Sequence, residues 1–85
     1  MSWEIVWTEH AQRDMRHLNR EVASRVLRAV NRFAETERGD LRKLGGEDEE
    51  WALRVGVWRV RFSYDRERNA VILLQVLPRR DVYRR

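Results

Sequence analysis

The chain has 85 residues, of which 42% are hydrophobic and 38% charged, and its formal net charge is +4. Apolar residues recur with clear periodicity, which excludes a disordered chain, and the absence of cysteine excludes disulfides and zinc–thiolate sites. We find no apolar run long enough to cross a bilayer and expect one cytosolic domain over residues 1–85.

The N-terminal part of the chain predicts a strand followed by two helices. Residues 3–7 alternate with Trp3, Ile5 and Trp7 on one side, which indicates a short strand. Thr8 can cap a first helix, and Asn19 can cap a longer second one that Gly39 ends. The apolar face of the second helix comprises Val22, Ala23, Val26, Leu27, Val30, Phe33 and Ala34. Because almost nothing separates the two helices, we expect an antiparallel helical hairpin.

A loop and a β-hairpin are predicted next. Residues 40–50 read as a loop, and the acidic run at its end is expected to be solvated. Strands at 51–56 and 57–64 are joined at Gly56-Val57 by a two-residue turn, in which glycine adopts a positive φ without steric cost.

The last strand completes the predicted fold. It covers residues 70–77, is almost continuously apolar, and ends at Pro78, so we expect it inside the sheet. The order of elements predicts an α+β fold with a mostly antiparallel four-stranded sheet. Its last three strands form an antiparallel meander, and the helices pack on one face.

The hairpin has one apolar surface and one arginine surface. Folding about the turn pairs Trp51 with Phe62, Leu53 with Val60 and Val55 with Trp58. On the other surface Arg54 lies across from Arg59, and Arg61 faces only an alanine. Opposed like charges cost about 0.2–1 kcal/mol, so we infer that an anion such as phosphate sits between Arg54 and Arg59. Solubilising arginines on an open sheet face are the alternative interpretation.

The charge distribution also points to an anionic partner. Residues 1–50 carry nine basic and eleven acidic side chains, whereas residues 51–85 carry nine basic and three acidic ones. All the basic residues except Lys43 are arginine, which binds phosphate in a bidentate manner. The partner is therefore expected to be a nucleic acid or an acidic protein. His10 and His17 alone make a poor metal site, and neither is expected near the arginine surface.

Three segments resemble a known family: 41–44 (LRKL), 53–60 (LRVGVWRV) and 79–83 (RRDVY). With the order of strands and helices, they make the whole chain similar to the RelE/ParE superfamily of bacterial toxins from type II toxin–antitoxin systems. The resemblance implies a partner encoded beside it, a net acidic, RelB-like antitoxin that shields or displaces the arginine surface.

The RelE branch implies a ribosome-dependent endonuclease that cuts mRNA without a metal or a small-molecule cofactor. By position, Arg59 matches the arginine on the scissile phosphate, and Arg54 matches a basic residue that stabilises charge or helps to move the proton. Arg79 matches a tail arginine that contacts phosphate or aids the leaving group. Tyr83 matches a tyrosine that stacks on or orients a base and can share in proton transfer. The resemblance further implies RNA contacts by Lys43, Arg61, Arg80 and Arg84.

The chain departs from the RelE pattern at one position just before the tail. Many relatives carry a histidine or lysine there, and this chain has Pro78. Arginine stays protonated at ordinary pH and is a poor general base. Two alternatives therefore stay open: a ParE-like inhibitor of DNA gyrase, and a catalytically weakened toxin that mainly binds its antitoxin.

Overall fold

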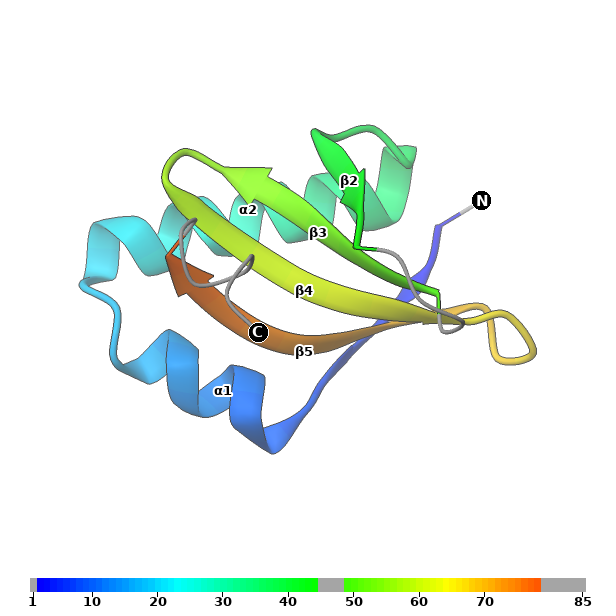
Figure 1. Ribbon diagram of the computed structural model, residues 1–85, viewed down its shortest axis with the longest axis horizontal. Helices are drawn as coiled ribbons and strands as arrows, with labels where there is room; N and C mark the ends of the chain where they lie inside the picture. The colour runs from blue at the N-terminus through cyan, green and yellow to red at the C-terminus, as the bar shows by residue number, and fades with distance from the viewer. Residues whose placement is uncertain (1, 45–48, 79–85) are drawn as a thin grey trace.

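The computed structural model describes residues 2–44 and 49–78, which form two helices and one five-stranded mixed sheet (Figure 1). The elements are β1 (Glu4–Trp7), α1 (Glu9–Arg16), α2 (Arg20–Thr36), β2 (Leu41–Lys43), β3 (Glu50–Val55), β4 (Trp58–Asp65) and β5 (Ala70–Pro78). The strand order is β1-β5-β4-β3-β2, with β1 parallel to β5 and all other neighbours antiparallel. The α+β class and the meander of β3, β4 and β5 are confirmed.

The prediction of a four-stranded sheet was wrong, because part of the expected loop at 40–50 is the edge strand β2. Residues Leu41–Lys43 pair antiparallel with Leu53–Trp51 of β3. Three residues are too few to show a period of two, so the sequence carries no alternation from which this strand could be predicted. The acidic run is also not simply solvated, since Glu49 pairs with Arg66 and Glu50 pairs with Arg61.

Both predicted helix caps are confirmed. The hydroxyl of Thr8 accepts a hydrogen bond from the Ala11 amide at 3.1 Å, and the Asn19 side chain accepts one from the Val22 amide at 2.9 Å. The predicted stop at Gly39 was wrong: α2 ends at Thr36, and Glu37 takes the left-handed conformation with φ 59°.

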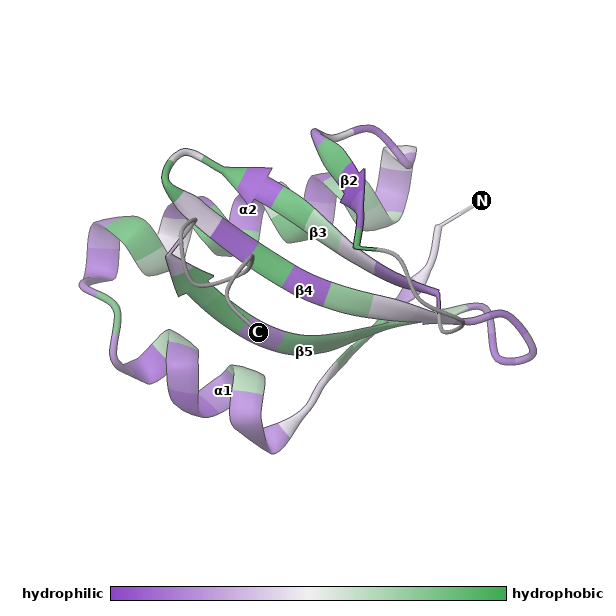
Figure 2. Ribbon diagram, in the orientation of Figure 1, coloured by the Kyte–Doolittle hydropathy of each residue, from purple (hydrophilic) through white to green (hydrophobic). Residues whose placement is uncertain are grey.

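The core lies between α2 and one face of the sheet. Val26, Val30 and Phe33 of α2 pack in one cluster with Val60 and Phe62 of β4. Leu27 is the exception on the predicted apolar face, since it is 44% exposed. Figure 2 shows that hydrophobic and hydrophilic residues alternate along β3 and β4, which directs one set of side chains to α2 and the other away from it.

The two helices run in opposite directions, but they cover different parts of the sheet (Figure 1). Both helices pack on the sheet, since Ala11 of α1 lies in the same buried cluster as Val26 of α2, and α1 contacts β5. β1 pairs with β5 only over residues 70–73, and further along that edge the Val76 amide donates to the Asp14 carboxylate at 2.9 Å. Neither helix of the described residues has the length and apolar character to span a membrane.

Candidate functional site

The arginine surface predicted from the hairpin register is present. Arg54 and Arg59 are Cα partners across β3 and β4, and Arg61 is paired with Ala52. Gly56 has a φ of 61° while Val57 does not have a positive φ, which is the pattern of a type II′ turn. The turn therefore fixes the register, and the register places the arginines on the sheet face that α2 leaves uncovered.

Arg59 is the only charged residue of the described chain that is buried, with 1% of its surface exposed. Its Nη1 donates to the carbonyl oxygens of Gly56 at 3.0 Å and Trp58 at 2.7 Å, while its Nε is buried without a hydrogen-bond partner. No carboxylate of the described residues forms an ion pair with it. A buried cation without a counter-charge is costly, so an anion that gained access to this guanidinium group would be bound favourably.

Arg54 has a different environment from Arg59. Its side chain is 37% exposed, and its Nε lies 3.4 Å from Asp40 Oδ2. The two arginines thus face each other in the backbone register, but their guanidinium groups contact different partners within the described residues. An anion held between them, as the sequence suggests, stays a prediction.

Arg61 is held in a network that crosses three strands. Its Nη1 donates to Gln75 Oε1 on β5 and its Nη2 donates to Glu50 Oε1 on β3. Arg61 and Glu50 are 23% and 21% exposed, so this ion pair is largely shielded from solvent. The carboxylate neutralises Arg61, which distinguishes it from Arg59.

A histidine lies beside this network, which contradicts the expectation that none is near the arginine surface. His10 Nε2 is 3.5 Å from Gln75 Nε2, and His10 Nδ1 is 3.1 Å from Asp14 Oδ2. The spacing of four between His10 and Asp14 could have indicated the pair. Their position next to Gln75 depends on how α1 lies along β5, and no sequence pattern gives that.

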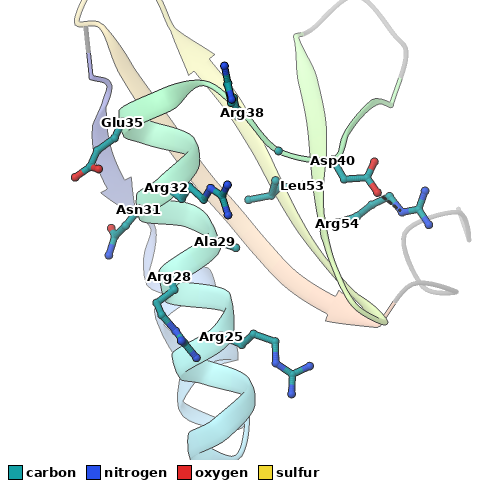
Figure 3. A pocket seen from close by; sticks show the side chains of 11 residues that line it. Arg25, Arg28, Ala29, Asn31, Arg32, Glu35, Arg38, Asp40, Leu53 and Arg54 are labelled. Atoms are coloured by element: carbon teal, nitrogen blue, oxygen red, sulfur yellow. Dashed lines mark ion pairs between the residues drawn. The ribbon is translucent and has the colours of Figure 1, made fainter.

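A second cationic surface is a groove of about 760 Å³ between α2 and β3 (Figure 3). Its apolar lining includes Ala29 and Leu53. Five arginines and two carboxylates surround it: Arg25, Arg28, Arg32, Arg38, Arg54, Glu35 and Asp40. No sequence pattern indicates this groove, because it forms between a helix and a strand that are distant along the chain.

The packing beside the groove explains why residue 39 is a glycine. A Cβ atom at this position would lie 2.7 Å from Leu53 Cδ1, which is closer than real Cβ contacts allow. The glycine is thus required by the close approach of the α2–β2 connection to β3.

The remaining predicted site residues divide into two groups. Lys43 is the cross-strand partner of Trp51, and its Nζ lies 5.9 Å from the Trp51 ring, so it lies on the side of the sheet opposite Arg61. Arg79, Arg80, Tyr83 and Arg84 lie outside the described residues.

Glu49 and Tyr64, at the end of the hairpin away from the Gly56 turn, have shifted pKa values. A hydrogen bond from Arg66 lowers the pKa of Glu49, and burial raises the pKa of Tyr64. The Arg66 guanidinium also lies 4.8 Å from the Tyr64 ring. These residues form a surface cluster around the β4–β5 turn. Among the described residues, no group of three or more histidine and carboxylate side chains could hold a metal ion.

Comparisons with known proteins agree with this architecture. A family model described as the ParE toxin of the type II toxin–antitoxin system parDE matches residues 5–83. A search of curated protein sequences found no significant match. Several solved structures share the fold at low sequence identity.

A chain of the RelBE2 toxin–antitoxin complex from Mycobacterium tuberculosis has 22% identity and a TM-score of 0.80, and the alignment covers 93% of this chain and 100% of that one. A chain of the RelE–RelB complex from Pyrococcus horikoshii has 21% identity and a TM-score of 0.76, with 93% and 97% covered. A mutant of Escherichia coli RelE in the free state has 22% identity and a TM-score of 0.74, with 98% and 92% covered.

Proposed function

This chain belongs to the RelE/ParE superfamily and is a toxin of a type II toxin–antitoxin system, and on that premise we propose that it cuts mRNA on the ribosome. The proposed reaction needs no metal. The 2′-hydroxyl of one nucleotide loses its proton and attacks the neighbouring phosphorus, and the bond to the 5′-oxygen breaks. The products are a 2′,3′-cyclic phosphate and a 5′-hydroxyl. The proposal places the protein in the cytoplasm, where ribosomes and mRNA are found.

The observation that carries this proposal is the environment of Arg59. Its guanidinium group is buried, has two backbone carbonyls as partners, and has no carboxylate partner in the described part of the chain. A phosphodiester would supply the missing negative charge, and the guanidinium would stabilise the further charge of the phosphorane-like transition state. We assign Arg59 to the scissile phosphate and Arg54 to charge stabilisation. Arg79 and Tyr83 are proposed to assist the leaving group and to orient a base.

Mapping of transcript ends tests this proposal. After induction of the protein, primer extension on a translated message should show new 5′ ends inside codons. Arg59→Ala should abolish them, whereas Arg68→Ala should not, because Arg68 lies in the β4–β5 turn with its side chain 85% exposed. Intact messages in cells that stop growing would overturn the proposal.

The alternative is inhibition of DNA gyrase, and the observation that favours it is the match to the ParE family model. This function requires a binding surface and no proton-transfer groups. An SOS response or trapped gyrase–DNA complexes, together with uncut messages, would support it.

A net acidic antitoxin is the proposed partner, since structural neighbours of this chain are toxin–antitoxin complexes. The groove between α2 and β3 is a suitable surface for one of its segments. Arginines outnumber carboxylates around the groove, and Ala29 and Leu53 offer an apolar lining. An acidic segment with an apolar side chain complements both features, whereas a bare phosphate backbone complements only the first.

A further inference from the structure

His10 is held at the border of the arginine surface by two fixed points of α1. At the start of the helix, the Thr8 hydroxyl donates to the Leu73 carbonyl at 2.7 Å. One and a half turns later, Asp14 Oδ2 accepts from the Val76 amide at 2.9 Å. Because both anchors bind the backbone of β5, the histidine between them has a defined position relative to the sheet.

The hydrogen-bond partners assign the tautomer of His10. Arg61 can only donate, so the Gln75 oxygen accepts from it and the Gln75 amide nitrogen is left to donate. That nitrogen lies 3.5 Å from His10 Nε2, and this contact favours the tautomer in which Nε2 carries the lone pair. In that tautomer the proton is on Nδ1, which donates to Asp14 Oδ2. The Asp14 carboxylate thus orients the His10 imidazole, and the Nε2 atom of that imidazole is directed at the sheet.

The basic nitrogen is available to a substrate. The His10 side chain is 53% exposed, and the 3.5 Å contact with the Gln75 amide is at the limit of a hydrogen bond. A closer donor, such as a ribose hydroxyl, could replace it. Arg61, which binds the same Gln75, lies two residues from Arg59 on β4 and therefore on the same sheet face, about 7 Å along the strand.

We propose that His10 accepts the 2′-hydroxyl proton at the arginine surface and that Asp14 is its positioning residue. This inference rests on the proposed RNA cleavage. His10 would act as the general base in place of the histidine or lysine that many relatives carry at the position of Pro78. His10 Nε2 takes the proton while the 2′-oxygen forms its bond to phosphorus. The 5′-oxygen leaves with the electron pair of its bond and takes a proton from water, and the imidazolium returns its own proton to solvent.

Other groups at this surface are less suited to accept the proton. The arginines stay protonated, and the Glu50 carboxylate is occupied by Arg61. Asp14 is occupied by the Val76 amide and by His10 itself. The charged groups that face His10 are thus Asp14 from its own helix and Arg61 behind Gln75.

The test is a pH–rate profile of mRNA cleavage in a purified translation system, using the full-length chain. His10→Ala should lower the cleavage rate by about 10²–10⁴-fold, and the fall in rate at acidic pH should disappear with the base. Asp14→Asn should also lower the cleavage rate, and combining it with His10→Ala should lower the rate no further, since Asp14 acts only through the imidazole. A merely structural role of Asp14 would lower the rate again in the His10→Ala background. His17→Ala, an exposed histidine beyond the end of the same helix, is the matched control and should cleave normally.

The outcomes separate the two proposals. If the wild-type protein cleaves mRNA and His10→Ala cleaves it at the same rate with the same pH profile, this inference is overturned and the proposed function is not affected. A wild-type protein that leaves the message intact on the ribosome overturns both. Circular dichroism and thermal melting of each variant check that the rate changes do not reflect unfolding.

Discussion

Replacing Gly39 with alanine tests whether close packing fixes the connection between α2 and β2. The added Cβ would lie 2.7 Å from Leu53 Cδ1, whereas ordinary contacts begin at 3.4 Å. Leu53 is 3% exposed and packs in the core, so its side chain can yield only toward the groove that it lines. Overpacking of this kind costs about 1–3 kcal/mol. The φ of Gly39 lies outside the left-handed region, so alanine meets no backbone strain there.

Glycine-to-alanine substitution also has a stabilising effect on the free energy of unfolding, so the sign of the measured change shows which effect is larger. Alanine restricts the unfolded chain and would stabilise the protein by about 0.4–1 kcal/mol if the contact were absent. We therefore expect a net loss of about 1–2 kcal/mol, with a Tm lower by about 4–8 °C for each kcal/mol. Urea unfolding at 25 °C and thermal melting measure it.

A double-mutant cycle with Leu53→Val isolates the contact, because valine has no Cδ1 atom. In that background Gly39→Ala should be neutral or stabilising. The explanation fails if Gly39→Ala stabilises the wild-type protein, or if it destabilises both backgrounds equally.

Two further predictions concern charged groups. Arg66→Ala should raise the pKa of Glu49 toward its ordinary value, as measured by NMR titration, since the hydrogen bond from Arg66 is what lowers it. The stability that the Glu49–Arg66 pair contributes should be present above the ordinary pKa of glutamate and be lost as the pH falls through the lowered pKa of Glu49. A Glu49 titration that is unchanged in Arg66→Ala would refute this explanation. Replacing Arg28 and Arg32 together by glutamate should weaken binding of the acidic antitoxin about tenfold or more at low salt, as measured by calorimetry. The control is Arg13→Glu on α1, and equal affinity of both variants would show that the groove is not used.

The hairpin could be predicted in detail because its determinants are local. Gly56 sets the turn, the turn sets the register, and the alternation of side chains then assigns each residue to a face. The caps at Thr8 and Asn19 are equally local, since each side chain binds an amide three residues later. The family resemblance has a related cause, since its motifs are short contiguous segments at 41–44, 53–60 and 79–83.

The candidate site could be predicted only in part. The pairing of Arg54 with Arg59 followed from the register, but the partners of their guanidinium groups did not. The RNA contact that the resemblance implies for Lys43 stays a prediction, and the short strand β2 places this residue beside Trp51 on the other side of the sheet. A charge pattern in the sequence carries no information about the sheet face unless the strand itself is recognised.

The amino-acid sequence by itself determined the two helices, the strands other than β2, the register of the hairpin and the arginine surface, because turns, caps and alternation act between residues that are close in the chain. Only the tertiary structure decided that α1 lies along β5 and that α2 approaches β3. These contacts join residues such as His10 and Gln75, which are 65 positions apart. They depend on how whole elements bury their apolar faces, and that is a property of the packed molecule rather than of any segment.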